Sequence, residues 1–166
     1  MKLLLLLSSL VLGDLVNNRV SRILDATTHL LRSSISVEIL NDGTDSVSEV
    51  QLSPDTVLGS DRLVFLSAKA DDVDLKISKD FNVNLVSPLK AGASITLEIS
   101  EIYYGGIRAF PTEIKQMDNQ LVIVEHNLYY SSPYTTKVQN SKINIGTKKT
   151  ESFPKQGNIY VIHRHM

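Results

Sequence analysis

Apolar and polar residues alternate with a period of two through most of the chain after residue 18. Ile35, Val37 and Ile39, for example, are separated only by a serine and a glutamate. Successive side chains of a β-strand point to opposite faces of the sheet, so this spacing puts the three apolar residues on one face. An Asn-Asp-Gly turn follows at 41–43, and residues 47–52 again resemble a strand. We therefore expect residues 34–39 and 47–52 to pair as a hairpin.

The same kind of pattern recurs along the rest of the chain, with turn residues at a spacing of about ten. A helix is the alternative only for residues 17–31, where β-branched Ile23 and a Thr-Thr pair disfavour it. The apolar run Leu-Val-Ile-Val at 121–124, in which three residues are β-branched, predicts a strand buried on both faces. The fold class we predict is all-β, a single antiparallel β-sandwich. Its further strands are expected at 63–68, 73–78, 81–86, 94–104, 119–130 and 135–145.

The N-terminus has the features of a signal peptide. Lys2 supplies a positive charge, residues 3–12 form an apolar run broken only by two serines, and Gly13 offers a small residue for cleavage. This run is too short to cross a bilayer, which takes about 20 residues. A strand or helix buried at the start of the chain is the alternative. We expect residues 1–13 to be the signal peptide and Asp14 to open the mature chain.

Charge and cysteine content exclude several functions. The net charge of the 166 residues is −1, which is unlike the concentrated basic surface that nucleic-acid binding requires. There are no cysteines, which excludes thiol nucleophiles and thiolate metal sites. A chain of this length buries enough surface to fold without disulfides, so the compartment stays open on this evidence.

No arrangement of side chains predicts catalysis. Glu125 and His126 are adjacent in a strand pattern and so point to opposite faces, and we expect His126 to be partly exposed. His163 and His165 lie in the last four residues, where chain ends fray. The acidic residues at 71–74 lack the ligand spacing of a calcium loop and predict a solvated turn. We expect no catalytic, cofactor-binding or metal-binding residue.

One segment differs from generic strand sequence, because three of the six tyrosines gather around a proline between residues 129 and 134. Tyrosine combines a large apolar area with a hydroxyl group, which suits interaction surfaces. The alternative is that these aromatic rings cover the edge of the core. The candidate interface residues are Tyr129, Tyr130, Pro133 and Tyr134.

Several motifs resemble the ribophorin I family, whose members are subunit 1 of the oligosaccharyltransferase complex. Residues 16–20 (VNNRV) and 22–25 (RILD) resemble the start of the mature family sequence. Residues 110–116 (FPTEIKQ) and 151–153 (ESF) resemble two further family motifs. The most specific match is residues 125–137 (EHNLYYSSPYTTK), which resemble a long tyrosine–proline block of the family. These motifs occur in the family's order.

This resemblance implies a non-catalytic subunit of the complex that transfers a dolichol-linked oligosaccharide to asparagine residues in the endoplasmic reticulum. It implies that residues 14–156 form a β-sandwich domain on the luminal side, with catalysis in another subunit and no cofactor here. The implied partners are the other oligosaccharyltransferase subunits and the nascent polypeptide.

In the family, a second luminal domain and one membrane-spanning helix follow the first domain, whereas no membrane span is expected in this chain beyond the signal peptide. Residues 157–166 resemble nothing in the family, and we predict a divergent tail there. Two functions remain open: a domain of an oligosaccharyltransferase subunit, and a secreted β-sandwich that binds protein or glycan outside any complex.

Overall fold

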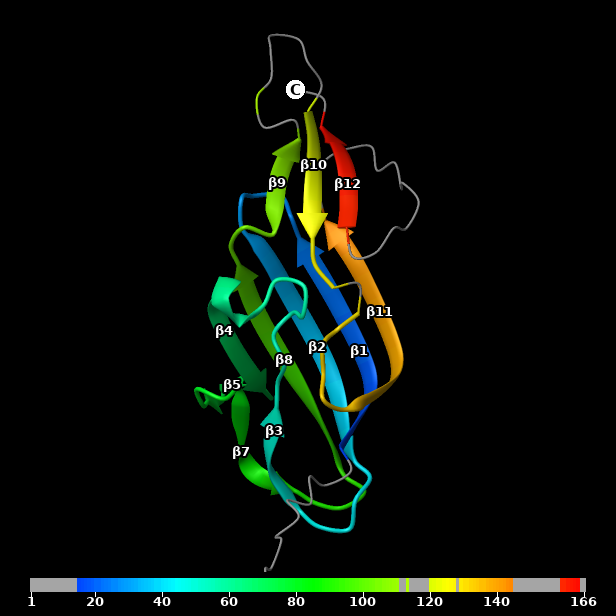
Figure 1. The fold of residues 1–166 in the computed structure, drawn as a ribbon. Coiled ribbons are helices and arrows are strands. Elements are labelled where there is room, and N and C mark those ends of the chain that lie inside the picture. Colours follow the sequence, from blue (N-terminus) through cyan, green and yellow to red (C-terminus); the bar gives the residue numbers. More distant parts are fainter. Residues whose placement is uncertain (1–14, 111–112, 114–119, 128, 145–158, 165–166) are drawn as a thin grey trace, which may run out of the picture.

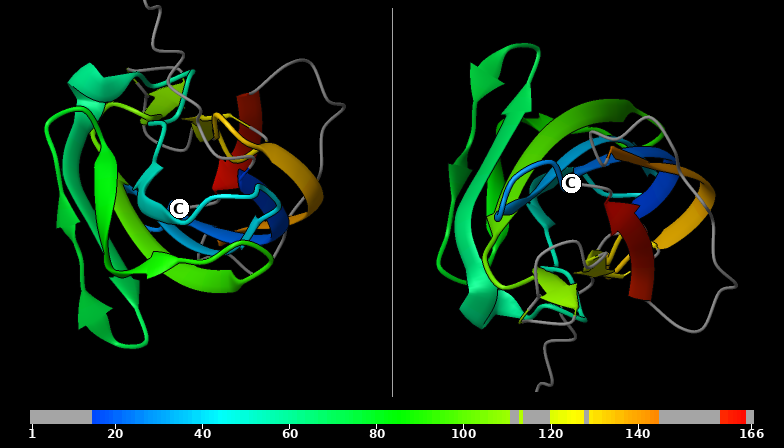
Figure 2. Two further views of the ribbon diagram at one scale, coloured as in Figure 1. Left: turned by 90° about the horizontal axis from the view of Figure 1, so that it is seen from below. Right: turned by 90° about the horizontal axis from the view of Figure 1, so that it is seen from above.

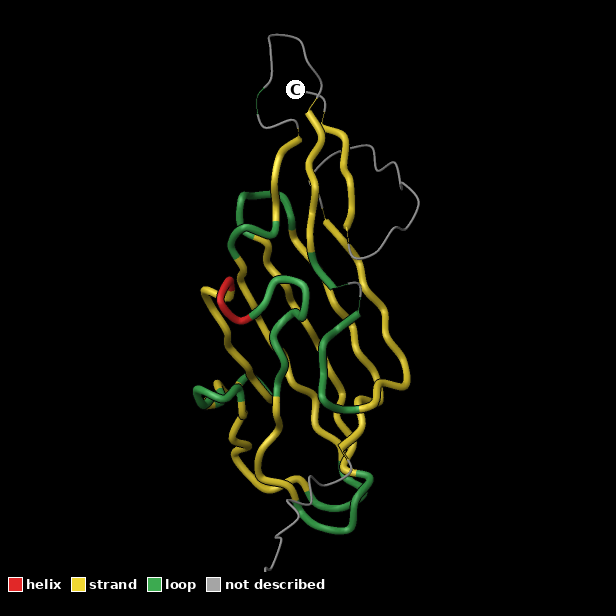
Figure 3. The backbone as a smooth tube through the Cα atoms, in the orientation of Figure 1, coloured by secondary structure: helices red, strands yellow, loops and turns green. Residues whose placement is uncertain are grey.

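The computed structural model describes residues 15–110, 113, 120–127, 129–144 and 159–164. Apart from one 3-10 turn, η1, the regular elements of this part of the chain are all β-strands (Figure 3). The elements are β1 (Leu15–Asp25), β2 (Leu31–Asn41), β3 (Val47–Gln51), η1 (Ser60–Arg62), β4 (Leu63–Ala70), β5 (Val73–Asp74), β6 (Lys76–Ile77), β7 (Asn82–Leu89), β8 (Ser94–Tyr103), β9 (Ile107–Phe110), β10 (Gln120–Glu125), β11 (Thr135–Asn144) and β12 (Ile159–Arg164).

Three sheets make up the fold (Figure 1). The largest has six strands in the order β11-β1-β2-β8-β4-β5. A three-stranded sheet, β3-β7-β6, lies against it, and another, β12-β10-β9, lies at one end of the molecule. The six-stranded sheet curves, and β3 lies on its concave side (Figure 2). The all-β class predicted from the sequence is confirmed.

The core forms between the concave face of the large sheet and the sheet that contains β3 and β7. Alternate residues of β2 and β8 point into it, as the period of two predicts. Val20, Val37 and Leu97 of the large sheet and Val50 and Val83 of the facing sheet are fully buried. A second, smaller apolar cluster lies towards the β10 end of the molecule and contains Leu24, Ala26, Leu31, Leu58, Tyr103 and Val124.

The hairpin predicted between residues 34–39 and 47–52 is wrong. Strand β2 pairs with β1 on one side and β8 on the other, whereas β3 pairs with β7. The Asn-Asp-Gly turn is present, and the Asn41 Nδ2 donates to the carbonyl oxygens of Asp45 and Leu89. Through these bonds the chain after β2 leaves the large sheet and enters the facing one. The expected hairpin around Lys79 and Asp80 is confirmed, since β6 pairs antiparallel with β7.

Other strand predictions need correction at the ends of the chain. The helix considered for residues 17–31 is absent, because residues 15–25 form β1. Strand β11 pairs with β1 in parallel, so the large sheet is mixed and not purely antiparallel. Residues 159–164, within the tail predicted to be divergent, form β12 and pair with β10, although fraying was expected from residue 163. The predicted signal peptide at 1–13 lies outside the described residues.

Candidate interaction surface

The tyrosine–proline segment, defined here as residues 127–134, connects β10 to β11. Its described residues place the four candidate interface side chains in different environments. Tyr129 is 64% exposed and Pro133 is also exposed. Tyr130 is 9% exposed and belongs to the main core. Tyr134 is half-buried, and its hydroxyl accepts a hydrogen bond of 2.8 Å from the backbone N–H of Gln51.

Exposed and anchoring residues therefore alternate within the segment. Tyr130 and Tyr134 fix it to the core and to the end of β3, which leaves Tyr129 and Pro133 as the members that a partner can reach. Whether those two contact a partner stays a prediction.

A buried arginine holds the start of the segment. Arg22 of β1 is 2% exposed and points to the inner face of the large sheet. Its Nη1 donates to the carbonyl oxygens of Asn127, at 2.9 Å, and Tyr129, at 3.5 Å. Its Nε donates to the Ser33 hydroxyl at 3.1 Å, and its Nη2 pairs with Asp55 Oδ2 at 3.2 Å. A guanidinium has five N–H donors in a rigid plane, so one side chain joins two strands, a loop and the segment.

Asp55 completes this anchor from the loop between β3 and η1. Its Oδ1 accepts the N–H groups of Val57 and Leu58, which fixes the loop locally. Its Oδ2 accepts the N–H of Asn127 at 2.8 Å beside the Arg22 contact. Gly59 ends the loop with φ of +78°, a conformation that glycine adopts without strain. One carboxylate thus ties the loop to the tyrosine–proline segment.

A second carboxyl group is buried next to this pair. Glu101 of β8 is 4% exposed, and burial raises its pKa to about 7, against smaller opposing effects of Arg22 and of hydrogen bonds from Ser33 and Tyr103. The Tyr103 hydroxyl accepts the N–H of Asp55 at 2.8 Å, and burial raises the pKa of Tyr103 further above its ordinary value. We call Arg22, Ser33, Asp55, Glu101 and Tyr103 the polar centre.

The polar centre separates the two apolar clusters of the core. On β1, Arg22 lies between Val20 of the main cluster and Leu24 of the smaller one. Along β8, Glu101 has the same position between Ile99 and Tyr103. Buried charges cost solvation energy, and here both members of the Arg22–Asp55 pair also bond to Asn127 of the segment.

The buried position of three residues of the polar centre could have been predicted from the strand alternation. Arg22, Ser33 and Glu101 occupy the same phase of the strand alternation as the buried Leu24, Ile35 and Ile99. A charged residue in the apolar phase of a strand indicates a buried polar site. Asp55 and Asn127 give no such signal, because they lie in loops and meet Arg22 only in the folded chain.

The expectation of a partly exposed His126 is wrong. Its side chain is 1% exposed, and burial is the main cause of a pKa below the ordinary value, since burial disfavours the charged form of the ring. The ring Nδ1 lies at hydrogen-bond distance from the carbonyl oxygen of Asn127. Glu125 next to it is on the surface and pairs with Arg108 at 2.9 Å. Among the residues described, no group of three or more His, Asp or Glu side chains is arranged to hold a metal ion.

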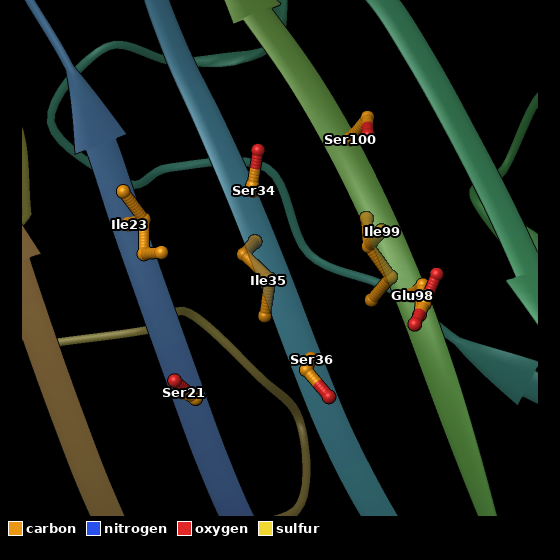
Figure 4. Close-up of a pocket in the computed structure, with 8 residues that line it drawn as sticks. All are labelled: Ser21, Ile23, Ser34, Ile35, Ser36, Glu98, Ile99 and Ser100. Atoms are coloured by element: carbon orange, nitrogen blue, oxygen red, sulfur yellow. The ribbon is translucent and has the colours of Figure 1, made fainter.

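The outer face of the large sheet has a shallow hollow of about 310 Å³ (Figure 4). Serines from β1, β2 and β8 make up half of its lining, with Ile23 and Glu98 at its sides. Its lining contains one carboxylate and no basic or aromatic side chain, so it offers neither an acid–base pair nor a stacking surface.

Comparison with models of known protein families shows which family the chain belongs to. The family model described as Ribophorin I matches residues 15–163, which include every strand of the structure except the last residue of β12. This chain belongs to the Ribophorin I family. The tyrosine–proline segment and all five residues of the polar centre lie within the matched region.

Curated relatives of this Ribophorin I chain carry one common name, dolichyl-diphosphooligosaccharide–protein glycosyltransferase subunit 1. Subunit 1A of Arabidopsis thaliana is 29% identical over 90% of the chain, and subunit 1 of Schizosaccharomyces pombe is 27% identical over 92%. Subunit 1 of Caenorhabditis elegans is 32% identical over 75% of the chain. The chain spans only 28%, 36% and 23% of the lengths of these three relatives, respectively.

Solved structures give a weaker likeness. An M1 zinc metallopeptidase from Deinococcus radiodurans matches 92% of the chain, and the chain covers 39% of it, at 10% identity and a TM-score of 0.47. A likeness at this level carries no argument about function.

Proposed function

We propose that this chain is the luminal, non-catalytic domain of an oligosaccharyltransferase subunit and supports protein N-glycosylation in the endoplasmic reticulum. The observation that carries the proposal is the Ribophorin I match over residues 15–163. Three relatives named as subunit 1 of the transferase support it. No helix in the described part of the chain is long and apolar enough to span a membrane.

The proposed role is to contact other subunits of the complex, or the nascent polypeptide, through the exposed part of the tyrosine–proline segment. Tyr129 and Pro133 present apolar area, and Val57 on the loop that Asn127 contacts adds more, being 37% exposed. The buried bonds of Arg22 and Asp55 support this role, because a segment held in one conformation loses little entropy on binding.

Co-purification from cells after mild detergent lysis tests the proposal. We expect the tagged chain to recover the catalytic subunit and other membrane subunits of the transferase. Recovery of chaperones alone, or secretion of the chain into the medium, would contradict it. That outcome would favour the second function, a secreted β-sandwich that binds protein or glycan outside the complex.

A further inference from the structure

Two carboxyl groups and one guanidinium are enclosed together where the tyrosine–proline segment meets the large sheet. Arg22, Asp55 and Glu101 are 2%, 3% and 4% exposed. Asp55 already accepts hydrogen bonds from Arg22, from Asn127 and from two N–H groups of its own loop. Asp55 therefore already pairs with Arg22, at 3.2 Å, and Glu101 is a second carboxyl group beside a single guanidinium.

The other groups that face Glu101 add no positive charge. Arg22 comes from β1, Ser33 from β2, Tyr103 from β8 and Asp55 from the loop before η1. Tyr130, from the tyrosine–proline segment, is also near: burial, and after it the charge of Glu101, raises the pKa of the Tyr130 hydroxyl. His126, just before the segment, has a pKa that is lowered mainly by burial, which disfavours its charged form. Arg22 is the one permanent cation among these groups, so ionised Glu101 beside the Arg22–Asp55 pair leaves a net charge of about −1 in the buried centre.

We propose that protonation of Glu101 controls whether the tyrosine–proline segment stays closed on the large sheet. When Glu101 is protonated, Arg22 and Asp55 balance each other and hold the carbonyl and amide groups of Asn127. Once Glu101 ionises, the unmatched buried charge is relieved by water, which enters when Tyr130 and its neighbours lift from the sheet. The proposal concerns the fold of the segment and stands whether or not the segment binds a transferase subunit.

The direction of the pH dependence follows from linkage. Burial raises the pKa of Glu101 from 4.5 to about 7, so the closed form keeps a proton that the open form loses. The closed form is then fully favoured below the ordinary pKa and loses that advantage as pH rises to 7. One proton is released, so the opening equilibrium rises about tenfold per pH unit between roughly pH 5 and 6.5 and levels off above about pH 7.

Hydrogen–deuterium exchange of the segment tests this, with protection factors corrected for the intrinsic effect of pH on amide exchange. The informative amides are those of Asn127, Gln51 and Thr56, because each donates a hydrogen bond between the segment and the rest of the domain in the closed form. We expect their protection to fall with rising pH in the unmodified chain and to be independent of pH in Glu101→Gln. Glu98→Gln is the matched control, because Glu98 lies on the same strand but on the exposed face. Equal pH dependence in Glu101→Gln and the unmodified chain would overturn the proposal.

A second measurement keeps the proposal testable if Glu101→Gln does not fold. The carboxyl carbon of Glu101 is followed by NMR in the ¹³C-labelled, unmodified chain as pH is varied. A titration midpoint near 7 that coincides with the loss of amide protection supports the proposal. A midpoint near the ordinary value of 4.5 would show that the group is ionised in the closed form and would contradict it.

Discussion

At the scale of single residues, Arg22 links three parts of the described structure through one buried side chain. It is on the inner face of β1 and bonds to β2, to the loop that carries Asp55 and to two carbonyl groups of the segment. A buried ion pair adds little net stability compared with an apolar pair, but removal of one partner leaves a buried charge unmatched. The consequences of substitution are therefore large and specific.

Arg22→Ala is expected to lower the free energy of unfolding by about 3–5 kcal/mol, since it strands the Asp55 carboxylate in the core. Arg19→Ala on the same strand is the control, because Arg19 is exposed and its loss should change stability by less than about 0.5 kcal/mol. Urea denaturation of the two variants and the parent gives the comparison. Equal effects of the two substitutions would show that the Arg22 contacts do not stabilise the fold.

Tyr103→Phe tests the second side of the polar centre. The Tyr103 hydroxyl accepts the N–H of Asp55, which is buried, so its removal leaves that donor without a partner. We expect a loss of about 1–3 kcal/mol in the free energy of unfolding. Tyr104→Phe is the adjacent control, since Tyr104 is 49% exposed and should tolerate the change. Thermal melts of both variants measure the effect. Equal melting temperatures for the two variants would show that the Tyr103 hydroxyl does not stabilise the fold.

At the scale of secondary-structure elements, β8 is central to the large sheet. It pairs with β2 on one side and β4 on the other, and its inner face carries Leu97, Ile99, Glu101 and Tyr103. The strand therefore contributes to the main core, the polar centre and the smaller cluster in turn. Its outer face is exposed and includes Glu98 and Ser100 at the hollow.

Leu97→Ala is expected to cost about 2–5 kcal/mol, because Leu97 is fully buried between the two facing sheets and its loss leaves a cavity. Ile23→Ala provides the contrast on the opposite face of the large sheet, where Ile23 is 50% exposed. Chemical denaturation should show the first change clearly and the second weakly. A small effect at Leu97 would mean that the sheets do not pack closely there.

At the scale of the whole molecule, the chain is a β-sandwich domain of the Ribophorin I family. The tyrosine–proline segment lies on its surface and is held there by buried hydrogen bonds. The anchoring residues and the exposed residues of that segment can be changed separately. Contacts with a partner can therefore be tested without disturbing the fold.

Tyr129→Ala combined with Pro133→Ala is expected to reduce co-purification of transferase subunits several-fold with an unchanged melting temperature, since both side chains are exposed. Val86→Ala is the control on β7, because Val86 is 78% exposed on a different strand. Quantitative immunoblotting of the recovered subunits measures the effect. Undiminished recovery with the double variant would place the contact surface elsewhere.

The sequence predicts the β class, most strand positions and the inward faces of β2 and β8. Ile35, Val37 and Ile39 alternate with polar residues, and all three are buried in the fold. Period-two spacing reports a face directly, because neighbouring side chains of a strand must point in opposite directions. Arg22 and Glu101 also occupy the inward phase of this alternation, but a charged side chain is normally expected on the exposed face.

The strand pairing and the meeting of groups in the polar centre are visible only in the folded chain. Alternation identifies a face but no neighbour, so β3 was assigned to β2 when its partner is β7. Strand β11 reaches β1 from more than a hundred residues away, and its parallel register leaves no local sequence signal. Arg22, Asp55 and Asn127 are likewise distant in sequence, and their hydrogen bonds exist only because folding brings a strand, a loop and the tyrosine–proline segment to one buried point.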